Sequence, residues 1–377
     1  MTGKTPSSKE AGVISDEESE YLFVTPRDMN QQEKVISRTE RYITNKVSSS
    51  FDKIILRGKS ICVSCIGTVG KVFMVNKPSI TNQQINSITS IDDRKCNADY
   101  LYYLLSTMSE EIQNLAGGTT MPIVNKSAFE NLEIALPDTT TQNKVANILS
   151  GLDERIASNN RTNDNLEKQG SLLVDDYFSK CLDEVSLSTI LSFANGFAFS
   201  SKDYLESGKY KIVTIKNVQD GKIDPAGASC LNEIPERMNK DCELKVGDIL
   251  LSLTGNVGRV GAVCDGNLLL NQRVAKIIPN NSTILPLLYF IFRQDSMKNT
   301  LESISKGTAQ QNLSPVETLK LKIKFDAEKA DNYSAILEPI LNKIIGNNIE
   351  NRRLIKLRDT LLPELLNGKI DVSNIDI

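Results

Sequence analysis

The sequence of 377 residues contains no histidine. Because histidine is the commonest general base and the commonest protein ligand of zinc, its absence removes the usual chemistry of both kinds of site. No apolar run approaches the roughly 18 residues of a membrane span, and the polar start MTGKTPSSKE lacks the apolar core of a signal peptide. We therefore expect a cytoplasmic protein with no membrane span and no bound metal.

The seven cysteines are an odd number scattered along the chain, which argues against a disulfide framework and favours a reducing compartment. Cys62 and Cys65 form a single CxxC, but SICVSCIG is typical of a buried strand, where positions three apart point to opposite faces. A second CxxC, which a zinc site would need, is missing. The net charge of −3 neither favours nor excludes nucleic acid, because the sequence does not show how the basic residues are distributed.

What the chain does contain is an internal duplication. SCIGTVGKV at 64–72 returns as SLTGNVGRV at 252–260, an offset of 188 residues (252 − 64). Three further pairs share an offset of 189 (210 − 21): YLFVTPRDM at 21–29 with YKIVTIKNV at 210–218, NQQI at 82–85 with NQRV at 271–274, and GTTMPIVN at 118–125 with GTAQQNLS at 307–314. These matches predict two copies of one domain, too few for a solenoid or propeller, and hence two similar surfaces that read a partner at two places.

Each copy is predicted to be a mixed, strand-rich region followed by a long helix. Strands are expected at 21–25, 60–66, 71–76 and 85–91 in the first copy and at 210–215, 248–254, 259–264 and 273–278 in the second. GTVG and GNVG each lie between two apolar runs and supply the glycines of a hairpin turn. Shorter helices are expected at 98–115 and 284–301, both followed by a Gly-Thr loop.

Long helices are expected near 140–180 and 330–367, each with a stripe at alternating spacings of four and three. The stripes are Val145, Leu149, Leu152, Ile156, Asn159, Asn163, Leu166, Gly170, Leu173 and Tyr177, and Leu337, Leu341, Ile344, Asn348, Asn351, Ile355, Arg358, Leu362 and Leu365. Such a stripe indicates a coiled-coil seam, and the asparagines would meet and fix the register of an antiparallel pair. The alternative is two amphipathic helices that lie apart, each on its own domain.

Two prolines bear on the second long helix. An interior proline costs about 3 kcal/mol, so Pro339 predicts a break or the true start of the helix, and Pro363 a kink or end of its last turns. A run of about 36 helical residues would be about 54 Å long, enough to hold two domains more than one DNA turn apart.

The first copy resembles the target-recognition domain of type I restriction–modification specificity subunits, through ILRGKSICVSCIGTVGKV, SITNQQINSI and GGTTMPIVNKSAFENLEIALP. The long helices are similar to that family's two helical spacers, through TQNKVANILSGLDERIASNNRTNDNLEK and NNIENRRLIKLRDTLLPELLNGKI. The resemblance covers nearly the whole chain. It implies an α/β (α+β) fold, with two duplicated mixed α/β recognition domains joined by two long antiparallel coiled-coil helices.

The resemblance also implies a function. The subunit would have no catalytic activity and no cofactor, and each domain would read one half of a bipartite site in double-stranded DNA. Methylation and cleavage would belong to modification and restriction subunits. The outward faces of the helices are expected to bind two modification subunits, one on each pseudo-equivalent surface, around Glu154, Arg155, Lys168, Lys343, Arg352 and Arg353.

The expected boundaries are 1–138 for the first recognition domain, 139–181 for the first spacer helix, 182–325 for the second recognition domain, and 326–377 for the second helix and tail. Gly3 of TGKTP is the loosest counterpart, since it matches Gly196 of NGFAF at an offset of 193 (196 − 3). EVSLSTILSFA precedes Gly196, whereas two residues precede Gly3. The first domain is therefore expected to lack its opening element, because of a truncated or misassigned start, or to be a weakened reader.

Candidate DNA contacts lie in the polar loops TGKTPSS, TNQQIN and GGTTMP of the first copy and NGFAFSSK, LNQRVAK and KGTAQQN of the second. Asn and Gln bind adenine bidentately, Arg and Lys bind guanine, and Thr or backbone groups bind phosphate. The candidates are Lys4, Thr5, Ser7, Lys71, Gln84, Thr119, Thr120, Lys216, Arg259, Arg273, Lys306, Gln310, Gln311 and Asn312.

The duplication helps to rank these candidates. Asn82 and Gln83 recur as Asn271 and Gln272, and features shared by domains that read different half-sites are expected to be structural more often than not. Positions that differ are better candidates for readout, namely Gln84 against Arg273, and Met121 and Pro122 against Gln310 and Gln311. Lys71 and Arg259 occupy matching hairpin positions that suit phosphate contacts and, equally, solvated surface charges.

Two rival functions use the same residues differently. Asp224, Glu243 and Lys245 have a loose D-x18-E-x-K spacing of the kind that holds Mg²⁺ in nucleases, but such a pattern arises by chance at 24% charged residues. GTVGKV at 67–72 lacks the spacing of a phosphate-binding loop, and neither an Asn-Pro-Pro-Tyr motif nor a glycine-rich cofactor loop is present. The other rival is a protein–protein scaffold that does not read DNA.

Overall fold

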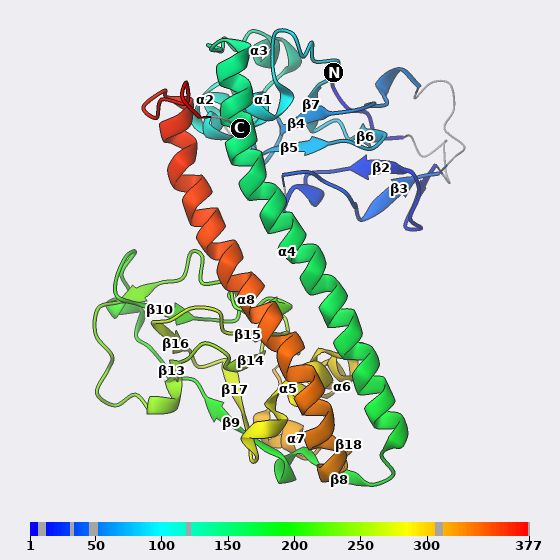
Figure 1. Ribbon diagram of the computed structural model, residues 1–377, viewed down its shortest axis with the longest axis vertical. Helices are drawn as coiled ribbons and strands as arrows, with labels where there is room; N and C mark the ends of the chain where they lie inside the picture. The colour runs from blue at the N-terminus through cyan, green and yellow to red at the C-terminus, as the bar shows by residue number, and fades with distance from the viewer. Residues whose placement is uncertain (7–12, 31–33, 45–51, 118–121, 306–311, 376–377) are drawn as a thin grey trace. The chain divides into compact units, whose positions relative to one another are not determined.

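The computed structural model describes residues 1–6, 13–30, 34–44, 52–117, 122–305 and 312–375. The chain divides into two compact units, Met1–Ala157 with Leu354–Ile377, and Ser158–Arg353. Each unit contains one copy of the duplicated domain together with segments of the two long helices, α4 (Thr139–Lys180) and α8 (Ala327–Leu366) (Figure 1).

The first unit is built on two sheets. One has the strand order β1-β3-β2-β6 and the other β5-β4-β7. The strands are β1 (Ile14–Ser15), β2 (Tyr21–Val24), β3 (Arg41–Ile43), β4 (Ser60–Ser64), β5 (Val72–Val75), β6 (Ser79–Thr81) and β7 (Ile85–Ile88). Helices α1 (Ala98–Thr107), α2 (Ser109–Asn114) and α3 (Lys126–Glu130) follow. All five residues of β4 are buried, and Ile61 and Val63 pack with Leu101 and Leu105 of α1 to form one core.

The second unit repeats this plan with more strands. Its sheets have the orders β12-β10-β16-β13, β11-β15-β14-β17-β9 and β18-β8. The strands are β8 (Glu184–Ser186), β9 (Leu191–Asn195), β10 (Tyr210–Val213), β11 (Gly221–Lys222), β12 (Cys230–Leu231), β13 (Glu243–Leu244), β14 (Ile249–Ser252), β15 (Val260–Ala262), β16 (Leu268–Leu270), β17 (Val274–Pro279) and β18 (Lys322–Lys324). The helices are α5 (Leu285–Arg293), α6 (Asp295–Ser305) and α7 (Pro315–Leu319). Short 3-10 turns are η2 (Asp28–Asn30), η3 (Asp52–Ile54), η4 (Leu187–Thr189), η5 (Ser201–Asp203), η6 (Lys240–Cys242) and η7 (Ser282–Ile284).

Each of the eight expected strands is found, within a few residues of its predicted ends. The two predicted hairpins are also confirmed, because β4 pairs antiparallel with β5 and β14 pairs antiparallel with β15. Their turn glycines have positive φ at the same places in both copies, 79° at Gly67 and 89° at Gly70, and 72° at Gly255 and 80° at Gly258. Residues with a Cβ avoid this region, which explains why both hairpins carry glycine there.

The two shorter helices are each divided, whereas the sequence predicted single ones. The first is interrupted at Met108, and the second at Gln294, whose ψ of 137° is extended. Ser109 and Asp295 then begin α2 and α6. Short polar side chains such as these favour helix starts, and an apolar pattern alone does not show where a helix turns a corner.

The long helices are antiparallel neighbours within each unit, as predicted, and do not lie apart. In the second unit the Asn159 amide donates to Asn351 Oδ1 at 2.9 Å, and the Asn163 amide donates to Asn348 Oδ1 at 3.1 Å. In the first unit Val145, Leu149 and Leu365 share one apolar cluster. The buried amides satisfy one another, so the polar layer fixes the register without leaving unpaired groups.

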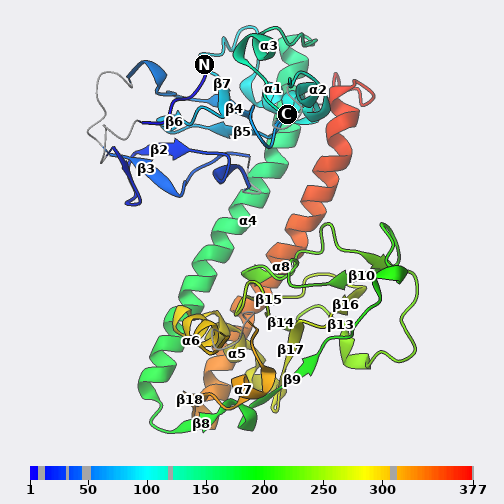
Figure 2. The ribbon, with the colours of Figure 1, turned by 180° about the vertical axis from the view of Figure 1, so that it is seen from behind.

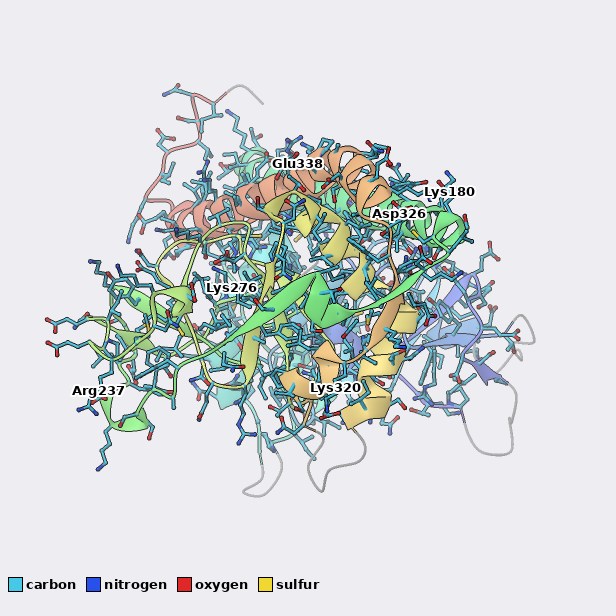
Figure 3. All side chains as sticks on the ribbon, turned by 90° about the horizontal axis from the view of Figure 1, so that it is seen from below. Lys180, Arg237, Lys276, Lys320, Asp326 and Glu338 are labelled. Carbon is cyan, nitrogen blue, oxygen red and sulfur yellow. The ribbon has the colours of Figure 1, made fainter. Side chains whose placement is uncertain are left out.

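The ends of the two helices in the second unit also meet. Lys180 ends α4 and Asp326 precedes α8, and the two lie close together (Figure 3). The Lys329 ammonium donates to the Lys180 carbonyl at 3.0 Å, and the Asp326 backbone N–H donates to the Tyr177 hydroxyl at 3.0 Å. These bonds close the helix pair at this end and place β8 and β18 beside it.

The expectation for Pro339 was wrong. Helix α8 begins at Ala327 and runs through Pro339 without an interruption. Both Pro339 and Ala335, whose carbonyl loses its hydrogen bond, are exposed, so water can bond to that carbonyl. The helix also continues past Pro363 and ends at Leu366, within one turn of it.

A close approach in the second unit explains one glycine of the predicted seam. A Cβ on Gly170 of α4 would lie 2.2 Å from the ring of Phe290 of α5, a distance that no real side chain tolerates. Helices α5 and α6 lie beside this segment of α4 (Figure 2), and Gln294 donates to the Ser171 carbonyl at 2.9 Å. Gly170 thus lets the recognition domain pack directly on the long helix.

Gly3 and Gly196, the loosest sequence match, are structurally equivalent. A Cβ on Gly3 would lie 2.1 Å from the carbonyl oxygen of Asn82, and one on Gly196 would lie 2.0 Å from that of Asn271. In the second copy β9 pairs with β17, with Asn195 opposite Ala275. In the first copy Thr2 takes the corresponding place opposite Asn86 of β7.

None of the helices, as far as the chain is described, has both the length and the apolar character that crossing a bilayer would demand.

Candidate nucleic-acid interface

Three loops converge in each copy through equivalent backbone hydrogen bonds. In the first copy the Cys65 N–H donates to the Gln84 carbonyl at 2.7 Å, and the Val124 N–H donates to the Cys65 carbonyl at 2.9 Å. In the second copy Leu253 donates to Arg273 at 3.0 Å, and Leu313 donates to Leu253 at 2.7 Å. The hairpin, the Asn-Gln turn and the end of the Gly-Thr loop therefore form one surface in each domain, which we call the three-loop surface.

The segment that contains Gly3 in the first copy and Gly196 in the second, which we call the glycine segment, also adjoins the three-loop surface. The Lys4 N–H donates to the Thr81 carbonyl at 2.9 Å, and the Phe197 N–H donates to the Leu270 carbonyl at the same distance. The Gln272 N–H returns a bond to the Phe197 carbonyl at 3.0 Å. The described parts of the loops that the sequence named as candidates for DNA contact thus lie together in each copy.

The polar side chains of the first surface are partly occupied with one another. Asn82 is buried, its amide donates to Gln84 Oε1 at 2.9 Å, and its Oδ1 accepts the Gln84 backbone N–H at 3.0 Å. Asn82 therefore holds the turn, as expected for a shared structural residue. The Thr5 hydroxyl donates to Gln83 Oε1, and Lys4, Thr5 and Gln83 are exposed. Lys71 is half-buried beside the hairpin.

The second surface presents different side chains. Gln272, Arg273 and Asn312 are exposed on it, and Asn312 forms an antiparallel bridge with Thr254 of the hairpin. Lys216 is exposed in the turn after β10, where Asn217 Oδ1 accepts the Thr214 N–H at 2.9 Å. Asp28 makes the matching bond to Thr25 at 2.7 Å in the first copy. The backbone scaffold is therefore shared while the exposed side chains differ.

Six of the predicted DNA contacts fall outside the described residues, namely Ser7, Thr119, Thr120, Lys306, Gln310 and Gln311. For the described candidates the structure supplies position and exposure, and their contacts with DNA stay predictions.

Arg259 was predicted to be a phosphate contact or a solvated surface charge, but its side chain contacts other residues of the domain. Its Nε lies 3.9 Å from Asp220, and its Nη1 donates to Gln219 Oε1 at 3.4 Å. Asp220 is also within ion-pair distance of Arg293 and Lys298. Sequence reasoning missed Asp220, Arg293 and Lys298, although all three differ from their first-copy counterparts, and such a difference was the criterion that selected Arg273.

Each domain is anchored to α4 by a tyrosine, a carboxylate and an arginine. In the second unit Tyr289 donates to Glu167, and Arg293 lies 3.4 Å from the same carboxylate. Burial, together with Glu167, raises the pKa of Tyr289 well above its usual value. Burial opposes the charge of Arg293, but the attraction of Glu167, Tyr289 and Asp220 together outweighs burial and raises the pKa of Arg293.

The first unit has its own anchor of the same chemistry. Tyr103 donates to Asp153 at 2.5 Å, and Arg358 Nη1 lies 2.8 Å from that carboxylate. Lys34 extends the group, because its ammonium is 2.6 Å from Asp99 and donates to Ser150 Oγ at 2.9 Å. Only 7% of the Lys34 side chain is exposed, and burial lowers its pKa.

Most of the predicted partner-binding residues of the helices are exposed, including Glu154, Lys168, Lys343 and Arg353. Arg352 is a correction. Its guanidinium donates to the Ile223 carbonyl and pairs with Asp265, so it packs against the second recognition domain. The heptad spacing placed it off the seam but could not show that a domain covers that side of the helix.

A concavity of about 630 Å³ adjoins the second surface. Phe197 and Phe199 line it, with ring centroids 5.0 Å apart, and the acidic residues Asp203, Glu233 and Glu236 also line it. Three carboxylates would repel a phosphate backbone, so this concavity is unsuited to bind one.

The residues of the rival nuclease reading have other roles. The Asp224 carboxylate accepts the Ala226 N–H at 3.0 Å and closes a turn, and Glu243 is exposed in β13. Where the chain is described, no three Asp, Glu or Cys side chains are grouped so that they could hold a metal ion.

The CxxC residues lie in different cores, as predicted. Cys62 packs with Leu22 and Phe73, whereas Cys65 packs with Val63 and Leu105. Burial raises the pKa of the Cys62 thiol to about 12, so this cysteine is inert at neutral pH.

Comparisons with known proteins agree with this geometry. Residues 1–168 and again 180–351 match the type I restriction modification DNA specificity domain. The specificity subunit of the type I restriction enzyme MjaIX from Methanocaldococcus jannaschii is 26% identical over 408 aligned positions, which cover 99% of this chain and 91% of the relative. The specificity subunit of the type I restriction enzyme HindI from Haemophilus influenzae is 36% identical over 180 positions, 46% of this chain and 37% of the relative.

A solved structure has the same fold. The S subunit of a type I restriction–modification system from M. genitalium superposes with a TM-score of 0.59 at 20% identity, covering 97% of this chain and 92% of that chain.

Proposed function

Because the chain belongs to the type I restriction modification DNA specificity domain family, and is a non-catalytic specificity subunit of such a system, we propose that each of its domains reads one half of a bipartite DNA site through its three-loop surface. The observation that carries the proposal is the duplicated scaffold with unlike side chains. The hydrogen bonds that hold Gln84 in the first copy hold Arg273 in the second. A conserved frame with exchanged side chains is what two readers of different half-sites require.

The proposed roles follow from exposure and chemistry. Arg273 suits a bidentate contact to guanine, because it is exposed on the Asn-Gln turn and carries a planar fork of donors. Gln84 suits adenine, although Asn82 must release its side-chain oxygen first. Lys71 and Arg259 flank the hairpins and suit phosphates, which position the domain on any sequence.

The long helices are proposed to carry the partners and to set the separation of the half-sites. Exposed residues such as Glu154, Lys168, Lys343 and Arg353 lie off the seam, on faces that the recognition domains leave open. Because the chain carries its domain twice, we propose two modification subunits, with restriction subunits joining through the complex. A measured ratio of one modification subunit per chain, with both proteins intact, would contradict this.

Mapping of methylated bases tests DNA reading most directly. The chain would be co-produced with modification subunits, and methylated positions would be compared in genomic DNA with and without it. The proposal expects methylation at a two-part motif that depends on the chain. A protein–protein scaffold would leave the methylation pattern unchanged, and purified chain would then show no shift of random duplex at low or moderate salt.

Two substitutions distinguish base reading from phosphate binding. Arg273→Gln should change preference at one half-site and leave the other unchanged. Arg259→Gln should weaken binding to every sequence and reduce the salt slope by about one unit. If both variants behave alike, the division of roles proposed for the second surface is wrong.

A further inference from the structure

One carboxylate in the second recognition domain is surrounded by three basic side chains. Asp220 lies in the loop between β10 and β11, and its Oδ1 is 3.1 Å from Nη1 of Arg293. Its Oδ2 is 3.9 Å from Nε of Arg259 and 3.7 Å from Nζ of Lys298. The cations come from α5, the glycine hairpin and α6, so only the folded domain assembles this group, which we call the Asp220 cluster.

The three cations are not held equally. Arg293 has a second carboxylate, Glu167, 3.4 Å from its Nε, and 21% of its side chain is exposed. Arg259 and Lys298 reach Asp220 only through the two longer contacts, and 31% and 36% of their side chains are exposed. Ion pairs of this length between solvated groups are weak. A competing anion can therefore take Arg259 and Lys298 from Asp220 while Arg293 stays with Glu167.

Asp220 itself is positioned so that it can move away from these cations. It lies in a loop, 44% of its side chain is exposed, and Gly221 follows it with a φ of 86°. A phosphate carries more acceptor oxygens than a carboxylate and forms strong charge-assisted bonds with Arg and Lys. The arrangement is that of a phosphate site occupied by a carboxylate of the protein's own chain.

We propose that Asp220 stands in for a DNA backbone phosphate in the free protein, and that Arg259 and Lys298 exchange it for a phosphate when the second domain binds duplex. This rests on the proposed function and adds a regulation of the same surface. The internal carboxylate lowers affinity for DNA of every sequence, because part of the electrostatic attraction must first be released. Base contacts on the three-loop surface then decide where the domain stays bound.

The first copy carries different residues at two of these positions. Lys71 is the counterpart of Arg259, but Ser109 stands where the second copy has Lys298, since a Cβ on Gly70 would meet Ser109 as one on Gly258 would meet Lys298. At the repeat offset of 189, the position of Asp220 is held by Gln31, which is uncharged. The competition is therefore proposed for the second domain, where Asp220 and Lys298 replace Gln31 and Ser109.

The test measures binding of the full-length chain to a random-sequence duplex by fluorescence anisotropy across a salt series. Asp220→Asn should raise affinity about 3- to 10-fold at low salt and steepen the logarithmic salt slope by about one unit. Asp241→Asn is the matched control, because it removes the same charge from an exposed residue of the same domain that has no ion pair with any described residue. The control should change affinity by less than about twofold. Adding Arg259→Gln to Asp220→Asn should abolish the gain.

The outcomes separate the inference from the function on which it rests. If the unaltered chain binds duplex and Asp220→Asn binds no better than Asp241→Asn, the inference is overturned and DNA reading stands. A loss of affinity in Asp220→Asn, with an unchanged circular dichroism melting curve, also overturns it, because Asp220 would then only position the hairpin. If the variant with both Asp220→Asn and Arg259→Gln keeps the higher affinity for duplex, Arg259 does not exchange Asp220 for a phosphate, and the inference is contradicted. If the unaltered chain binds no duplex at any salt concentration, the proposed function itself fails, and the inference with it.

Discussion

In the first recognition domain Lys71 follows the glycine hairpin, whose Gly70 lies against Ser109, whereas in the second Arg259 follows it, Gly258 lies against Lys298, and both cations reach Asp220. The backbone bonds that hold the two hairpins are the same. The Ser64 N–H donates to Lys71 and the Ser252 N–H donates to Arg259, each at 2.9 Å. The comparison shows that the duplicated domain keeps its hydrogen-bonded frame and changes the charges placed on it. That division is what the proposed reading of two different half-sites requires.

Substitutions that disrupt the shared hydrogen-bonded frame should have the largest effect on stability. Gly196→Ala places a Cβ 2.0 Å from the Asn271 carbonyl oxygen, a backbone atom that cannot move alone. We expect it to destabilise the second domain by about 2–3 kcal/mol, as measured by denaturant unfolding. Gly3→Ala should do the same to the first domain. Gly266→Ala, with no atom within 4 Å of its Cβ, is the control and should change stability by less than about 0.5 kcal/mol. Equal effects for Gly196 and Gly266 would show that the shared frame is not tight.

The carboxylates that anchor the two domains to α4, Asp153 and Glu167, can be compared in the same way, and their loss should have a smaller effect on stability. Asp153→Ala leaves Tyr103 without its carboxylate and leaves Arg358 only the more exposed Asp359, and 10% of the Asp153 side chain is exposed. Glu167→Ala removes the partner of Tyr289, but Arg293 keeps Asp220, and 21% of the Glu167 side chain is exposed. We expect losses of about 2 kcal/mol for Asp153→Ala and about 1 kcal/mol for Glu167→Ala in chemical unfolding. A larger loss for Glu167 would show that Asp220 does not support Arg293.

Low pH should have the smallest effect of the three, a loss of stability in the first domain that depends on Asp99. Burial opposes the charge of Asp99, but its bonds to Lys34 and Lys59 outweigh burial and lower its pKa. A carboxyl whose pKa is lowered on folding stabilises above its unfolded pKa, and this contribution is lost as the pH falls through the folded value. Amide hydrogen exchange should therefore show the first domain weakening as the pH falls below about 4, and Asp99→Asn should remove this part of the pH dependence. If exchange in α1 has the same pH dependence in both proteins, Asp99 does not contribute it.

The parts of the fold that could be predicted were mostly those that short-range sequence patterns indicate. Short apolar runs on either side of GTVG and GNVG located β4, β5, β14 and β15, whose residues are almost all buried. The 3.5-residue stripes located the antiparallel helices and their asparagine layer. Pro339 was misread because its cost depends on whether its surroundings are solvent, which the sequence does not record.

The site was predicted less completely, and for a physical reason. The candidate loops were found through their repetition, and backbone hydrogen bonds join the described parts of them to one another. The Asp220 cluster and the contact of Arg352 with Asp265 join residues far apart in sequence. Local spacing carries no signal for such pairs. Comparison of the two copies, position by position, is the one sequence signal that could have drawn attention to Lys298 and Asp220.

The central claim, that each copy reads its own half-site through a shared frame, is tested most directly by Arg273→Gln. Binding of this variant would be measured against duplexes that vary one half-site at a time, across a salt series. The account predicts a loss of about 1–3 kcal/mol in discrimination at one half-site, with the other half-site and the salt slope unchanged. Equal weakening on every duplex, with a salt slope reduced by about one unit, would make Arg273 a phosphate contact and would contradict the account.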